Sequence, residues 1–231
     1  IFIACGLFTA AAAVVSIRLR TDDIALQTTV GKGLKELLGV PGWIPLMIGV
    51  FFTIGFHQTA TNYFGLFMDE LGASEAQIGL WQSIPSLGNV IMMTFVLPTR
   101  LQKWGSERMF VLAAIFSTLR FAGWILVPTT TAAGFVNILM LLAFPPAFLA
   151  AVDCAARYAP KGMEATSQAL VTGLISPLGN SALNSLAGTL YDQVGIRSMF
   201  GIYAIGSATL AIILALFWRK RIFVRIKKTA D

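Results

Sequence analysis

Apolar residues fill six stretches of this 231-residue chain, and short polar segments separate them. Apart from Arg120 in the fourth, no charged residue falls in these stretches, which run over 1–17, 37–68, 76–99, 109–152, 165–191 and 198–218. A helix that crosses the hydrocarbon core of a bilayer, about 30 Å thick, needs about 20 mainly apolar residues. The fourth stretch is long enough for two such helices, joined by the turn-like segment 128–131. The pattern therefore predicts an all-α membrane protein whose membrane-spanning helices lie at about 1–17, 43–68, 77–98, 109–127, 133–156, 165–187 and 198–218.

The basic residues fall almost entirely in alternate gaps between the predicted spans and in the tail. Of the 17 lysines and arginines, all but Arg120 and Arg197 lie in the first, third and fifth gaps or after residue 218. Short loops rich in lysine and arginine mark the cytoplasmic side of a membrane protein. We therefore expect a multi-pass protein of the plasma (inner) membrane with its C-terminus in the cytoplasm.

The lengths of the loops divide the chain into four parts. The span at 1–17 is followed by the only long polar segment, 18–42, which we expect to be a cytoplasmic linker. The six spans over 43–218 are joined by short loops, and we expect them to form one bundle. Residues 219–231 form a basic cytoplasmic tail. Because the chain opens in an apolar stretch without a methionine, we also expect further protein upstream.

Composition narrows the function classes. A chain with 56% hydrophobic and 12% charged residues is not an ordinary soluble domain. The net charge of +6 follows from the cytoplasmic loops, and without a concentrated basic patch we expect no nucleic-acid partner. One histidine, two cysteines and scattered glycines provide no metal-ligand set, nucleophile–base arrangement or phosphate-binding loop. We therefore expect no enzyme, no metal and no cofactor.

Polar side chains recur at helical spacing in three of the predicted spans. Each group lies on one helix face, and amides or hydroxyls that faced lipid would lack hydrogen-bond partners. Hydrogen bonding between helices explains any single group as well as ligand binding does. Three groups together favour a shared polar cavity, lined by His57, Gln58, Thr61 and Asn62, by Gln82, Ser86 and Asn89, and by Ser176, Asn180 and Asn184.

Arg120 is the strongest single signal in the chain. It lies about 11 residues into the span that begins near residue 109, and a central arginine costs about 2.5–3.5 kcal/mol even on the most lenient insertion scale. Arg120 therefore needs a partner, which the sequence leaves open as an acid, helix carbonyls, or an anionic or hydroxyl-rich ligand.

Two further residues are candidates for proton coupling. Asp153 is the only acid inside a predicted span, but Arg157 follows one turn later, so an ion pair at the membrane interface is an alternative to a proton or substrate role. His57 either carries a proton or is a neutral, hydrogen-bonded histidine.

Three local segments resemble the branch of the major facilitator superfamily that contains lactose permease and the nucleoside–proton symporters. The segment FHQTATNYF at 56–64 is similar to the permease's seventh-helix pattern F-x-Q-x-x-x-N-aromatic-F, and LRFAG at 119–123 matches its ninth-helix arginine. The segment LAGTLYDQVG at 186–195 resembles the branch's turn after helix eleven. The layout of one span, a linker and six spans is also that of the C-terminal half of a twelve-helix transporter.

This resemblance implies a secondary transporter that moves a small polar solute, such as a sugar or nucleoside, by proton-coupled alternating access. Its partners would be the solute, protons, the lipid bilayer and a six-helix N-terminal half. The permease's seventh-helix acids correspond here to Ile54 and His57, so lactose itself is not the expected solute. The residues expected to bind the solute are His57, Gln58, Asn62, Gln82, Asn89, Arg120, Asn180 and Asn184.

Two other functions remain open at this stage. An aromatic content of 11% and eight methionines are also compatible with an exporter of amphipathic compounds. A sealed bundle without a central polar cavity would instead indicate a membrane subunit or receptor that transports nothing.

Overall fold

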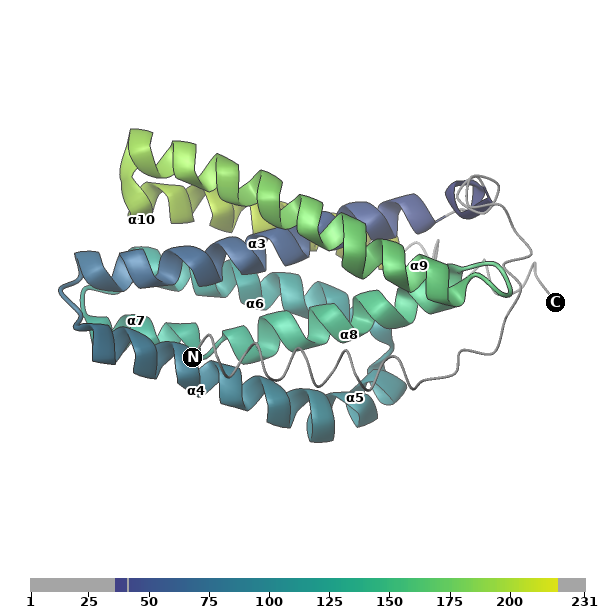
Figure 1. The fold of residues 1–231 in the computed structure, drawn as a ribbon, viewed down its shortest axis with the longest axis horizontal. Coiled ribbons are helices and arrows are strands. Elements are labelled where there is room, and N and C mark those ends of the chain that lie inside the picture. Colours follow the sequence, from purple (N-terminus) through teal and green to yellow (C-terminus); the bar gives the residue numbers. More distant parts are fainter. Residues whose placement is uncertain (1–35, 41, 220–231) are drawn as a thin grey trace, which may run out of the picture. The chain divides into compact units, whose positions relative to one another are not determined.

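The computed structural model describes residues 36–40 and 42–219, and every regular element in this part of the chain is a helix (Figure 1). Within these residues, five helical runs are long and apolar enough to cross a membrane, at Trp43–Glu70, Glu75–Trp104, Ser106–Leu126, Thr130–Tyr158 and Glu164–Phe217. This confirms the all-α membrane class. The predicted span at 1–17, most of the linker and all but the first residue of the basic tail lie outside the described residues.

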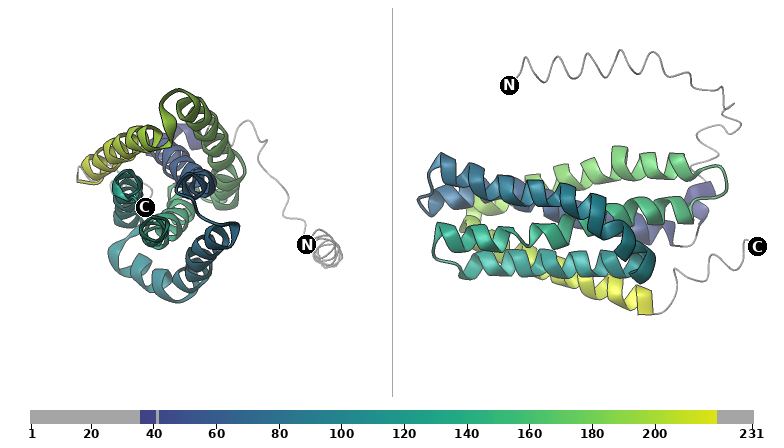
Figure 2. Two further views of the ribbon diagram at one scale, coloured as in Figure 1. Left: turned by 90° about the vertical axis from the view of Figure 1, so that its left-hand side faces the viewer. Right: turned by 90° about the horizontal axis from the view of Figure 1, so that it is seen from below.

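Each run begins and ends close to the predicted spans, but several are divided internally. The elements are α3 (Trp43–Glu70), α4 (Glu75–Ile91), the π-helical η1 (Met92–Val96), α5 (Leu97–Trp104), α6 (Ser106–Leu126), α7 (Thr130–Asn137), α8 (Met140–Tyr158), α9 (Glu164–Leu170), the π-helical η2 (Val171–Ile175) and α10 (Ser176–Arg219). Figure 2 shows them lying side by side as a bundle.

The last run contains two helices rather than one. Gly195 interrupts α10 with φ of 77° and ψ of 166°, which is not a helical conformation. Glycine adopts a positive φ at no steric cost, so the chain reverses here (Figure 1). The predicted span at 165–187 covers α9, η2 and the start of α10, and the span at 198–218 lies in the part of α10 after Gly195, whereas much of the loop expected between them is helical. The seven-helix arrangement as a whole stays a prediction.

Each π-helical segment ends two residues before a proline. Pro98 follows η1 and Pro177 follows η2, and a proline ring clashes with the carbonyl four residues earlier in a regular α-helix. The wider π turn relieves this clash, since Leu97 donates to the Met92 carbonyl and Ser176 to the Val171 carbonyl, each five residues back. A π turn therefore accommodates both prolines. Pro177 lies inside the predicted span at 165–187, and Pro98 is the last residue of the predicted span at 77–98.

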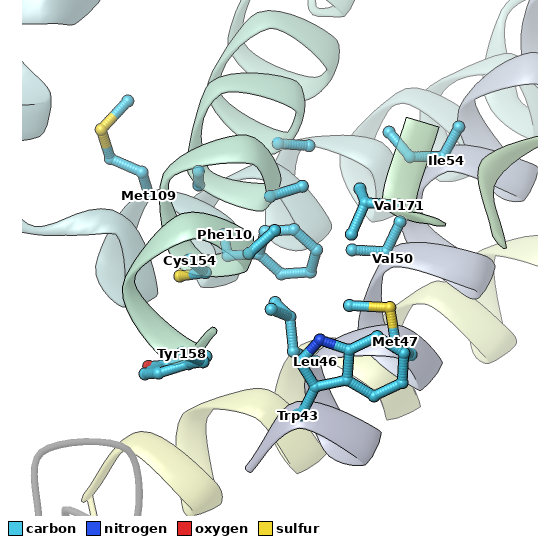
Figure 3. Packing of buried hydrophobic residues seen from close by; sticks show 14 of the residues in the cluster. Trp43, Leu46, Met47, Val50, Ile54, Met109, Phe110, Cys154, Tyr158 and Val171 are labelled. Carbon is cyan, nitrogen blue, oxygen red and sulfur yellow. The ribbon is translucent and has the colours of Figure 1, made fainter. Parts of the chain in front are cut away.

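The bundle has two buried apolar clusters. Figure 3 shows the first, where Trp43 and Met47 of α3 pack near Phe110 of α6 and Tyr158 of α8. Trp43 Nε1 also donates to Ser167 Oγ at 3.0 Å, which ties α3 to α9. The second cluster is rich in aromatic rings and includes Phe64, Phe67, Phe121, Trp124, Phe200 and Tyr203. Because lipid is as apolar as these side chains, close packing between rings is what holds the helices together.

Helices α3 and α10 approach each other backbone to backbone. A Cβ atom built on Gly179 would lie 2.2 Å from the Phe51 carbonyl oxygen, and one built on Gly55 would lie 2.6 Å from the Gly179 carbonyl oxygen. Only glycine fits at either position without a shift of the backbone. The crossing brings the polar residues that follow Gly55 on α3 beside those that follow Gly179 on α10.

Candidate functional site

Arg120 lies in the second half of α6 with 2% of its surface exposed. Its Nη2 donates to Asn137 Oδ1 at 2.6 Å, and Asn137 Nδ2 donates to the Trp81 carbonyl at 3.0 Å. The guanidinium carbon lies 4.6 Å from the centre of the Trp124 ring, one turn later on α6. The partners of this buried cation are thus a neutral amide and an aromatic face. The sequence pattern does not reveal Asn137, because no other polar residue lies within one helical turn of it.

A small cavity of about 60 Å³ lies beside this arginine. Five of its seven lining residues carry polar side chains, and among the described residues Arg120 Nε has no hydrogen-bond partner. The cavity can therefore offer a charged N–H donor, hydroxyl groups and amides to a small polar group. Its lining residues are Thr61, Phe64, Gln82, Ser86, Arg120, Asn137 and Met140.

A second, larger cavity of about 270 Å³ lies where α3, α8 and the first part of α10 meet. Gln58 and Asn180 contribute amides to its wall, and Phe144 and Phe148 contribute aromatic rings. This wall combines hydrogen-bonding groups with apolar surface. It would suit a solute that has both polar groups and a ring.

His57 lies between the two cavities. Its ring stacks on Phe144 of the second cavity at 4.2 Å, and its Nε2 lies 3.5 Å from the Oγ1 of Thr61, which lines the first. Thr61 Oγ1 donates more closely to the His57 carbonyl, at 3.0 Å. The His57 side chain is buried, and its Nδ1 has no hydrogen-bond partner within the described part of the chain.

The amides of α3 and α10 form a chain of hydrogen bonds. Asn62 Nδ2 donates to Asn184 Oδ1 at 2.9 Å, and Asn184 Nδ2 donates to both the carbonyl and the side-chain oxygen of Asn180. Asn62 is exposed and Asn184 is half-buried. These predicted site residues are therefore partly satisfied by each other, at the surface of the described bundle.

The polar residues of α4 divide between two environments. Gln82 and Ser86 line the cavity beside Arg120 and are exposed, whereas Asn89 is half-buried and its Oδ1 has no hydrogen-bond partner in the described residues. In the helical run Glu75–Trp104, which begins with α4, only 11% of the most apolar part is buried. The single cavity expected from the sequence is thus two cavities, with His57 between them.

Asp153 lies in a different cluster. Its Oδ2 is 2.7 Å from Arg157 Nε, as the i, i+4 spacing predicts, and it also accepts a hydrogen bond from Ser106 Oγ. Glu107 lies 3.4 Å from Arg157 and accepts a 2.9 Å hydrogen bond from Tyr158. The cluster ties the start of α6 to the end of α8, and its residues line neither polar cavity.

Comparison with known proteins identifies the family. The model of the MFS_1 like family matches residues 2–202, which is most of the chain. The chain belongs to the MFS_1 like family. It is also similar to the uncharacterized transporter YwbF of Bacillus subtilis (strain 168), with 26% identity over 220 residues. That alignment covers 93% of this chain and 54% of the relative, so the chain spans about half the length of the curated protein it matches.

Membership of the MFS_1 like family assigns the chain to transport proteins rather than enzymes. The apolar helical runs are accordingly those of an integral, multi-pass membrane protein. The major facilitator part of the resemblance is confirmed. The lactose permease and nucleoside branch, the position in the C-terminal half and the roles of individual residues remain predictions.

Proposed function

We propose that this chain is the C-terminal half of a secondary transporter that moves a small polar solute, sugar-like or nucleoside-like, by alternating access. The observation that carries the proposal is the convergence of polar side chains from α3, α4, α6, α7 and α10 on two cavities that flank His57 in a largely apolar bundle. Groups of this kind are costly inside a membrane and mark solute pathways. Solute sites of such transporters lie between two halves, near the bilayer midplane.

The two cavities have different roles in this proposal. Beside Arg120, the free Nε–H donates to a hydroxyl or carbonyl oxygen of the solute, while Gln82 and Ser86 bind neighbouring groups. In the second cavity, Gln58 and Asn180 hydrogen-bond the solute, and Phe144 packs against its ring. Asn62, Asn184 and Asn89 extend this polar surface along the same helices.

The open face of the bundle supports a second half. Asn62 on α3 and Gln82 and Ser86 on α4 are exposed, and exposed amides and hydroxyls are expensive against lipid. A six-helix N-terminal half that covers this face would satisfy them and enclose the solute. In the plasma (inner) membrane, the basic loops and the C-terminus would lie on the cytoplasmic side.

We also propose that transport of the solute is coupled to movement of protons. His57 is the leading candidate, since it is a buried titratable group that lies between the two cavities, against Phe144 and Thr61. A proton on His57 would add a second cation to the same buried region, so solute binding at Arg120 and protonation of His57 would influence each other. Asp153 is the second candidate and would act through its ion pair with Arg157.

The test is uptake into proteoliposomes that contain the full-length protein. With an inward proton gradient and a labelled panel of hexoses, disaccharides and nucleosides, we expect accumulation of at least one class, and collapse of the gradient by an uncoupler should abolish it. Solute addition without a gradient should acidify the lumen. If no polar solute accumulates under any gradient, the proposal is wrong.

The apolar wall of the second cavity keeps one alternative open. Ile54, Phe144 and Phe148 would also bind an amphipathic compound. An exporter of such compounds would couple proton entry to their expulsion. Extrusion of an amphipathic dye from the same proteoliposomes, together with no uptake of sugars or nucleosides, would favour this alternative.

A further inference from the structure

A third cavity of about 220 Å³ lies between the α4–α5 run, α6 and α8, and it shares no lining residue with the two polar cavities. Its wall is almost wholly apolar and includes Val96, Leu112, Phe116 and Leu142. Met92 and Val96 belong to the π-helical segment η1, which precedes Pro98. This third cavity is an apolar groove, and it lies where Pro98 disturbs the helix.

One end of the groove carries a cation and an indole. Arg100 and Trp104 of α5 both line it and are exposed, and the guanidinium carbon of Arg100 lies 5.4 Å from the Trp104 ring centre. Among the described residues, no acid lies within ion-pair distance of Arg100. Arg100 belongs to the third gap, which the positive-inside pattern assigns to the cytoplasmic interface.

The chemistry of the groove restricts what fills it. Water needs two to four polar partners, and this wall supplies almost none. An empty groove would forfeit the dispersion contacts of its lining side chains. In a bilayer, acyl chains are the abundant apolar molecules, and anionic lipid headgroups are attracted to basic residues at the cytoplasmic surface.

We propose that this groove binds an anionic phospholipid, with an acyl chain against Val96, Leu112 and Leu142 and the phosphate at Arg100. Trp104 lies at the same end, where its ring contacts the chain and its N–H faces the headgroup region, as is usual for interfacial tryptophan. The apolar wall favours a lipid over a soluble anion. The cation at one end favours an anionic lipid over a neutral one.

The experiment uses the full-length protein, purified in detergent and stripped of lipid. Native mass spectrometry and thermal unfolding are followed during titration with phosphatidylglycerol, with phosphatidylcholine of the same chains, and with inorganic phosphate. Arg100→Gln removes the cation, Leu142→Trp fills the groove, and Lys161→Gln is the matched control, because Lys161 is an exposed cytoplasmic-side cation outside the groove.

We expect phosphatidylglycerol to bind more tightly than phosphatidylcholine and to raise the unfolding temperature, while inorganic phosphate does neither. Arg100→Gln should weaken phosphatidylglycerol binding about fivefold, which corresponds to about 1 kcal/mol for one cation. It should weaken phosphatidylcholine binding less, because the choline cation offsets the charge of the phosphate. Leu142→Trp should abolish lipid retention, and Lys161→Gln should change nothing. Equal losses in Arg100→Gln and Lys161→Gln, stabilisation by inorganic phosphate, or retention of lipid by Leu142→Trp would each overturn the proposal.

Discussion

Replacing Arg120 with glutamine is expected to reduce solute uptake about 10- to 100-fold, because a hydrogen bond from a charged donor contributes about 1.5–3 kcal/mol. Arg120 supplies the only charged donor among the residues that line the 60 Å³ cavity. Glutamine keeps a donor but loses the charge and the planar contact with Trp124. The measurement is initial uptake rate against solute concentration in proteoliposomes that contain the full-length variant.

Two control variants separate this effect from a general loss of structure. Arg120→Lys keeps the charge but not the forked geometry, so it should retain part of the uptake. Lys161→Gln removes an exposed cation far along the chain and should transport normally. If Arg120→Gln folds and transports at the normal rate, Arg120 has no central role.

Replacing Asn137 with alanine is expected to lower the stability of the bundle by about 1–3 kcal/mol, which is the cost of leaving a buried polar group without its partner. Asn137 is 2% exposed and joins Arg120 of α6 to the Trp81 carbonyl of α4. Its loss therefore leaves both a cation and a carbonyl unsatisfied. The free energy of unfolding is measured by denaturant titration in detergent.

A double-mutant cycle shows whether this cost arises from Arg120. In the presence of Arg120→Leu, the Asn137→Ala change should cost less than in the wild type, since no buried cation is then left unpartnered. Asn137→Asp should recover only part of the loss, because a carboxylate accepts the hydrogen bond from Arg120 but cannot donate to the Trp81 carbonyl. Purely additive losses in the cycle would show that the hydrogen bond between Arg120 and Asn137 contributes nothing.

The sequence predicts the helical runs well because each is a long apolar segment with polar ends. The π-helical segments were harder to predict, since Pro98 is the last residue of an expected span and only Pro177 lies well inside one. Gly195, which ends the first part of α10, lay within a broad expected loop. The span at 1–17 stays a prediction.

Arg197, the exception to the charge pattern, has a structural explanation. It donates to the carbonyls of Ile125 and Val127 at 2.8 and 3.0 Å, and it lies over the ring of Phe67. These are carbonyls at the C-terminal end of α6, where a cation is favoured. Charge counts alone do not predict such a contact between residues about 70 positions apart.

Burial of Arg120 follows from its position in the sequence, but its partner does not. The i, i+4 stripes reveal polar faces on single helices, whereas Asn137 is an isolated amide on α7 whose role depends on the packing of α6 against α7. The same limit applies to Asp153, for which local spacing predicts Arg157 but not Ser106 from another helix. Contacts between distant helices require the fold.

The central claim is that the polar residues of α3, α4 and α10 face a water-filled solute pathway rather than lipid. The direct measurement is the rate of cysteine labelling in full-length protein free of other cysteines. It compares Asn184→Cys with Ile205→Cys. Ile205 is 70% exposed and lies in the apolar second part of α10. A water-soluble maleimide reacts with the thiolate, which an apolar environment disfavours. Asn184→Cys in intact membranes should therefore be labelled about tenfold faster or more than Ile205→Cys. Equally slow labelling at both positions would contradict the account.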